Sequence, residues 1–188
     1  MNGLCSDEEI GELMTAMQAD DGSDLAATDR LIGRYPDDPR LHFLRGSILA
    51  GIGRSIEALP ALRRAVDLAP DFAIARFQLG FFQLTSGEAA DALGTWGPLA
   101  FLPDDHYLRI FVGGLTHLIR DEFADAIEQL EKGIALNSEN PPLNRDMQLI
   151  IDQTKPLLSA DAPAAVEAGA ASATSFLLGQ FGDRGRPH

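Results

Sequence analysis

The chain has 188 residues, of which 45% are hydrophobic and 23% charged, as expected of an ordinary globular protein with one substantial core. Its 28 acidic and 15 basic side chains give a formal net charge of −13. Nucleic acids and anionic membrane surfaces attract Lys/Arg-rich proteins, so this charge disfavours both as partners.

The N-terminal stretch and the cysteine content indicate a cytoplasmic protein. The stretch "MNGLCSDEEI" lacks the basic region and apolar run of a secretory signal. With a single cysteine, Cys5, no intrachain disulfide can form, which fits a reducing compartment. No window approaches the roughly 18 uninterrupted apolar residues that a membrane-spanning helix needs.

Residues 1–38 are predicted to form two helices. Ser6 and Glu9 have the spacing of a capping box at a helix start. A second helix is expected to end at the turn "YPDDP". We interpret residues 1–38 as a degenerate first repeat or an N-terminal helical cap. The apolar positions of the two helices are Ile10, Leu13, Met14, Met17, Leu25, Leu31 and Ile32.

A period of 34 residues follows, and it aligns without gaps. Glycines recur in one column, alanines in a second, and a large apolar residue stands four positions after each alanine. The columns define three units, 39–72, 73–106 and 107–140, within 39–140. Their members are Gly46, Gly80 and Gly114; Ala58, Ala92 and Ala126; and Leu62, Trp96 and Leu130.

Each unit is predicted to hold two antiparallel helices. The glycine of the first helix and the alanine of the second allow close approach, and the large residue fills the space beside them. One such pair cannot bury both of its faces, so neighbouring pairs must stack on it. Two second helices also contain helix breakers, Pro60 and the pair Gly97–Pro98, which are expected to bend or shorten them.

This pattern resembles the tetratricopeptide repeat family, most clearly in "GIGRSIEALPALRRAVDLAP" and "DEFADAIEQLEKGIAL". The resemblance covers residues 39–140 and implies an all-α solenoid of antiparallel helix pairs, wound into a right-handed superhelix with helical caps. The family's terminal proline is Pro70 in the first unit but comes one residue early as Pro103 in the second. Ser138 replaces it in the third unit.

Two segments follow the repeats. Residues 141–158 are expected to form a polar C-terminal capping helix, as solenoids require. Residues 159–188 form an Ala-rich tail that contains the apolar segment "SFLLGQF" and an end expected to be disordered.

The sequence contains no persuasive catalytic or metal-binding pattern. "GIGRSI" has only two glycines of a dinucleotide-binding fingerprint, and no strand precedes it. The acidic cluster Asp104, Asp105 and His106 lies at a turn between repeats, where acidic residues are common. His42 and His117 fall at packing positions and are expected to be partly buried and hydrogen-bonded. We therefore expect no enzyme activity, no cofactor and no metal.

The resemblance implies that the first helix of each pair faces a concave groove. The positions that it carries over are mainly apolar, so the groove is expected to bind an apolar helix or an extended peptide. The fifth and ninth positions of the units hold none of the Lys, Asn and Arg with which one branch of the family grips C-terminal carboxylates. The groove residues used below are Phe43, Ser47, Ile74, Phe77, Phe81, Leu84, Leu108, Phe111, Leu115 and Leu118.

Two alternatives to partner binding remain open for these positions. A phenylalanine stripe at helical spacing is often core, and the tail could instead dock on the groove through Phe176, Leu177 and Phe181, in the same chain or in a homodimer. The sequence thus favours a non-catalytic, acidic, cytoplasmic scaffold of the kind found among bacterial secretion chaperones. A self-assembling structural protein is the alternative, and an enzyme is the weaker one.

Overall fold

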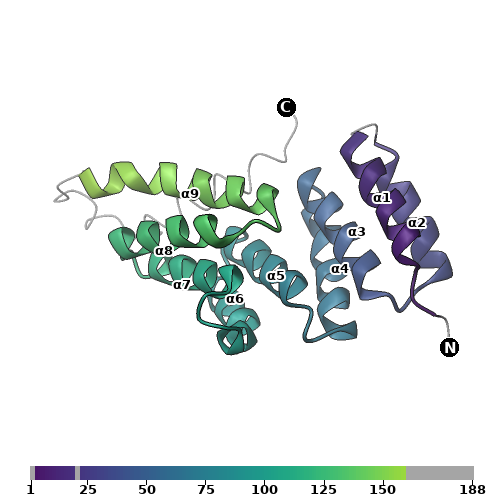
Figure 1. Ribbon diagram of the computed structural model, residues 1–188, viewed down its shortest axis with the longest axis horizontal. Coiled ribbons are helices and arrows are strands. Elements are labelled where there is room, and N and C mark those ends of the chain that lie inside the picture. The colour runs from purple at the N-terminus through teal and green to yellow at the C-terminus, as the bar shows by residue number, and fades with distance from the viewer. Residues whose placement is uncertain (1–2, 20–21, 160–188) are drawn as a thin grey trace. The chain divides into compact units, whose positions relative to one another are not determined.

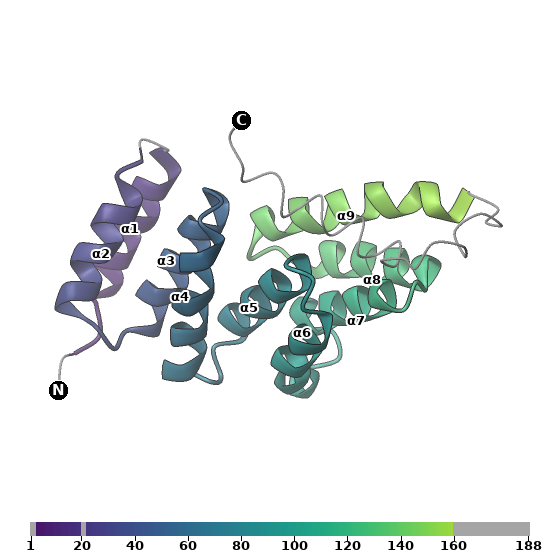
Figure 2. The same ribbon diagram turned by 180° about the vertical axis from the view of Figure 1, so that it is seen from behind.

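The chain folds into helices joined by short turns. A computed structural model describes residues 3–19 and 22–159, and within them it contains nine α-helices, one 3-10 helix and no strand (Figures 1 and 2). The predicted all-α fold is confirmed. The elements are α1 (Asp7–Ala19), α2 (Asp24–Arg34), α3 (Pro39–Gly51), α4 (Ser55–Leu68), α5 (Ala73–Thr85), α6 (Ala89–Trp96), η1 (Gly97–Phe101), α7 (Tyr107–Ile119), α8 (Phe123–Leu136) and α9 (Pro141–Ser159).

Two compact units make up the chain, and the boundary between them lies inside α5. The first unit runs to Phe82, and the second begins at Gln83. The first therefore contains α1 to α4 and most of α5, and the second contains the end of α5 and the helices from α6 to α9.

The first unit has a core on each side of Phe43. One cluster joins α1 and α2 to α3 through Leu13, Leu41 and Leu44. A second cluster joins α4 to α5 around Leu62. The half-buried ring of Phe43 packs against both clusters, so α3 links the N-terminal helices to the following pair.

The second unit is built around the pair α7 and α8, with α9 packed against α8 (Figure 1). Helix α9 spans the residues for which a capping helix is predicted. It buries one apolar stripe and leaves most of its other positions exposed. The buried stripe consists of Leu143, Met147, Ile150 and Ile151.

The glycine column allows the close approach that the sequence predicts. A Cβ built on Gly46 would lie 2.7 Å from the side chain of Leu62, and one on Gly114 would lie 2.8 Å from that of Leu130. Ala58 is fully buried as well, with 0% of its surface exposed. In both pairs the large residue of the second helix occupies the space that the glycine leaves.

The turn inside each pair has the same geometry three times, at a spacing of 34 residues. Gly53, Gly87 and Asp121 have φ angles of 75°, 86° and 59°. The residue after each donates its backbone N–H to a carbonyl five positions earlier, over 2.8 to 3.0 Å, as in a Schellman motif. Asp121 thus adopts a left-handed conformation that glycine adopts with less strain.

The two predicted helix breakers act differently. Pro60 lies inside α4, which continues through it. Gly97–Pro98 ends α6 after only 8 residues, and the chain continues as the 3-10 helix η1. Leu99, 3% exposed, anchors η1 to the protein.

Replacing Gly114 by Ala should lower the free energy of unfolding by about 1 kcal/mol, because the new methyl group overpacks against Leu130. The neighbouring Gly113 is the matched control, since a Cβ there meets nothing within 4 Å. Gly113→Ala should raise the free energy of unfolding by about 0.5–1 kcal/mol through helix propensity. Urea denaturation measures both, and equal effects of the two substitutions would contradict the close-approach role of Gly114.

Candidate functional site

The predicted groove residues of the first unit lie on α3 and α5. Phe43, Ser47 and Ile74 are half-buried, whereas Phe77 and Phe81 are buried, with 0% and 8% of their surfaces exposed. The Ser47 hydroxyl donates a 3.0 Å hydrogen bond to the backbone carbonyl of Phe43. Within this group, the half-buried side chains are those that retain surface for a partner.

The groove residues of the second unit are buried more deeply. The ring of Phe111 lies against Gly133 of α8, where an added Cβ would come within 2.5 Å of it. Tyr107 packs edge-on to the same ring, with centroids 6.0 Å apart. Phe111 therefore belongs to the packing of the α7–α8 pair, which is the core alternative left open by the sequence. The remaining four, each at most 1% exposed, are Leu84, Leu108, Leu115 and Leu118.

Burial separates the ten groove residues into two groups. Seven are buried, and the three half-buried ones belong to the first unit. Sequence spacing could identify the face of each first helix but not its depth in the protein. The proposed docking residues Phe176, Leu177 and Phe181 lie outside the described residues.

A buried polar network that the sequence did not predict joins the N-terminal segment to α3. The carboxylate of Asp38, 1% exposed, accepts hydrogen bonds from the backbone N–H of Cys5 at 2.9 Å and from Arg40 at 2.8 and 3.1 Å. Arg40 also pairs with Asp7 at 2.7 Å. The only signal in the sequence is the Asp-Pro-Arg order at a helix start, where an Asp is a common N-cap.

The same network sets the ionisation of three groups. Burial of Cys5, together with its hydrogen bond to Glu9, raises the pKa of the thiol to about 11. The backbone N–H of Ser6 lowers the pKa of Glu9 to about 2. Burial acts to raise the pKa of Asp38, but hydrogen bonds from Arg40 and Cys5 hold it below its usual value. Cys5 is therefore a protonated, poorly nucleophilic thiol at neutral pH.

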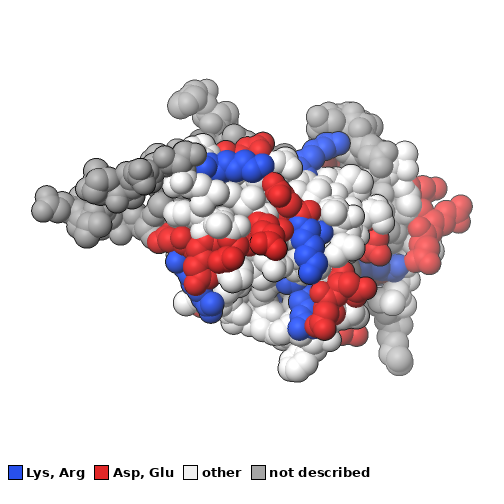
Figure 3. All heavy atoms as spheres, turned by 60° about the vertical axis from the view of Figure 1, so that its left-hand side comes forward, with Lys and Arg blue, Asp and Glu red and all other residues white. Residues whose placement is uncertain are grey.

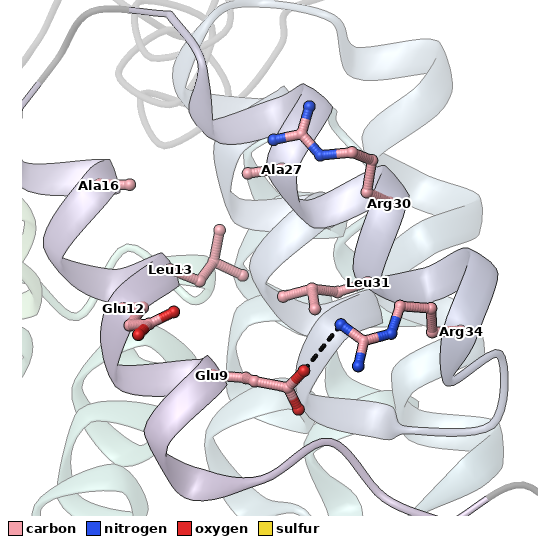
Figure 4. A pocket seen from close by; sticks show the side chains of 8 residues that line it. All are labelled: Glu9, Glu12, Leu13, Ala16, Ala27, Arg30, Leu31 and Arg34. Atoms are coloured by element: carbon pink, nitrogen blue, oxygen red, sulfur yellow. Dashed lines mark ion pairs between the residues drawn. The ribbon is translucent and has the colours of Figure 1, made fainter.

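A cavity of about 410 Å³ opens between α1 and α2 (Figure 4). Apolar side chains, among them Leu13 and Leu31, form its inner surface. Glu9 and Arg34 pair across it at 2.8 Å. The cavity could accept a small apolar group, but neither the pair nor its neighbours form a catalytic arrangement.

The histidines within the described residues, His42, His106 and His117, have structural roles. The Nε2 atom of His42 lies 2.7 Å from the carbonyl oxygen of Pro36, and Nδ1 of His117 lies 2.6 Å from the Glu122 carboxylate. Both are half-buried, as predicted. His106 caps α7 by accepting the backbone N–H of Leu108 at 3.2 Å. Within residues 3–19 and 22–159 no group of three His, Cys, Asp or Glu side chains could hold a metal ion.

Acidic side chains gather in several groups on the face shown in Figure 3, with fewer basic side chains between them. Uncharged surface separates these groups. Such a surface attracts basic partners and repels anionic ones.

The fold is similar to that of MamA, residues 41 to the end, from Desulfovibrio magneticus RS-1. The TM-score is 0.57, and the match covers 85% of this chain and 92% of the MamA chain at 16% sequence identity. The likeness supports a tetratricopeptide-like helical repeat fold. No family model and no curated protein sequence matches the chain.

Among the described helices, none is both long and apolar enough to cross a membrane.

Asp38→Ala should lower the free energy of unfolding by about 3 kcal/mol, because it leaves Arg40 and the Cys5 N–H without their buried partner. Asp37→Ala is the matched control, since the exposed Asp37 makes a surface ion pair with Arg64. Its expected loss is about 0.5 kcal/mol or less. Chemical denaturation measures the difference, and similar losses would show that the network is not what fixes the N-terminal segment.

The Cys5 thiol should react slowly with iodoacetamide in the native protein at pH 8.5 and rapidly in urea. Because the pKa in the folded state, about 11, is above that of an unfolded cysteine, its contribution to stability is full below about pH 8.5 and is lost as pH rises towards 11. Wild type should therefore lose more stability than Cys5→Ala between pH 8 and 10.5, roughly the window between the two pKa values. Equal labelling rates in native and unfolded protein would refute the predicted protection of the Cys5 thiol.

Proposed function

We propose that the protein is a non-catalytic scaffold that binds an apolar helix or extended segment of a partner protein. The observation that carries this proposal is the repeated helix pair, with its glycine close approach and its three identical turns. Repeats of this kind make stiff extended surfaces suited to binding segments of other proteins.

Contact with the partner is proposed to begin at the half-buried groove residues of the first unit. Phe43 packs against two core clusters and also meets Phe72 edge-on at 5.4 Å, so its substitution would disturb the fold. Ile74 is half-buried in the first turn of α5. Substituting Ile74 therefore tests binding with the smallest structural cost.

In finer terms, we propose a cytoplasmic, chaperone-like role, in which the scaffold keeps an apolar segment of another protein covered. The small size and net charge of −13 favour this version, because a strongly charged carrier stays soluble while it holds an apolar client. The chaperone-like version of the proposal rests on the fold and on the net charge.

Ile74→Glu should abolish capture of the partner from a lysate of the source organism while the variant still unfolds cooperatively. A glutamate in the first turn of α5 suits the helix dipole, so the loss would report on binding rather than on folding. Ile56→Glu is the matched control, because Ile56 occupies the same place in the first turn of α4 and is 91% exposed. Equal capture by wild type and Ile74→Glu would contradict the proposed contact.

Self-assembly is the second candidate, and the surface that Phe43, Ser47 and Ile74 retain would be available to it. In this version the tail residues Phe176, Leu177 and Phe181 cover the first helices in the same chain or in a second copy. Light scattering would then give a concentration-dependent mass that Leu177→Glu reduces to that of a monomer. A monomer at all concentrations would exclude the intermolecular form.

A further inference from the structure

The outward surface of α6 and η1 differs from every equivalent surface in the repeats. Residues 92–103 contain no charged side chain in a chain that is 23% charged. Phe101 is 92% exposed, and Leu93 is 38% exposed. Both side chains are thus open to solvent, Leu93 on α6 and Phe101 at the end of η1.

The other two repeats are internal controls for this surface. One period earlier, the positions of Gly97, Pro98 and Phe101 hold Arg63, Arg64 and Asp67, all exposed. One period later, the first two positions hold Glu131 and Lys132. The same outward face is therefore charged in the first and third repeats and uncharged in the second, so position in the solenoid does not explain an exposed phenylalanine.

The helix break gives this surface its form. Gly97–Pro98 converts the end of the second helix into η1, which Leu99 anchors beneath it. A Cβ on Gly94 or Gly97 would meet nothing within 4 Å, so the backbone at these two glycines is open to approach. Large aromatic side chains such as Phe101 are enriched among the anchors of protein interfaces.

The charges at the ends of the patch identify the kind of partner. Glu88 and Asp91 precede it, Asp104 and Asp105 follow it, and all four are exposed. Asp104 pairs with Arg109 at 2.5 Å, whereas the other three make no ion pair within the described residues. An apolar centre between free carboxylates matches an apolar surface flanked by Lys and Arg.

A second copy of the chain is a poor match for this surface, because like charges repel. Each copy carries a net charge of −13, and two such patches facing each other would bring their carboxylates together.

We propose that the α6–η1 surface is a second binding site, independent of the predicted groove residues, and that it takes a basic amphipathic helix of another protein with Phe101 as its anchor.

A fluorescent amphipathic helix made of Leu and Lys is the probe, and anisotropy at physiological salt gives its dissociation constant. Phe101→Asp places in the second repeat the residue type that the first repeat has at Asp67, so it should fold normally, as a thermal melt would verify. We expect it to weaken binding about tenfold or more through loss of the buried ring. Because it also adds a negative charge, binding by charge alone would become tighter, so unchanged or tighter binding would overturn the proposal.

Ile56→Asp is the matched control, since it removes an equally exposed apolar side chain, 91% exposed, and makes the same charge change. It should leave the dissociation constant within about twofold, as surface charges contribute little. Equal weakening by both variants would overturn a specific site at α6–η1. A mass in light scattering that falls from dimer to monomer on Phe101→Asp would also overturn it, because the occupant would then be a second copy.

Discussion

The fold depends on the close approach of two helices at a glycine. In the α3–α4 and α7–α8 pairs, the side chains of Leu62 and Leu130 lie 2.7 and 2.8 Å from where a Cβ of Gly46 and Gly114 would be. That contact fixes both the distance and the register of the pair. The turns at Gly53 and Asp121 end the first helix of each pair in a Schellman motif.

The middle repeat keeps this contact pattern in sequence but ends its second helix early. Trp96, 1% exposed, stands where its neighbours have leucine, and Gly97–Pro98 stops α6 immediately after it. The chain then turns as η1, which has no counterpart in α4 or α8. A local break in the backbone thus precedes the exposed Phe101, and the proposed second binding site lies at this point.

At the N-terminus, a buried polar contact attaches one segment to the next, whereas in the repeats apolar packing does so. Asp38 is buried, caps α3 and holds both Arg40 and the backbone of Cys5. A buried carboxylate of this kind is stable only because all its partners are present. The segment before α1 is thereby attached to α3, although α1 and α2 leave a cavity between them.

The sequence by itself determined the helix pairs, because a 34-residue period constrains every repeat at once. It also predicted the capping box, in which Ser6 and Glu9 exchange hydrogen bonds of 3.2 Å, and that Gly97–Pro98 would bend or shorten the second helix, which ends there. These are local features, in which nearby residues determine the backbone conformation.

Only the tertiary structure decided the depth of each apolar side chain. Phe111 and Phe101 are both phenylalanines in helical segments, yet one lies against Gly133 with 0% exposed and the other is 92% exposed. Burial depends on what packs from elsewhere in the chain, and no spacing within one helix records it.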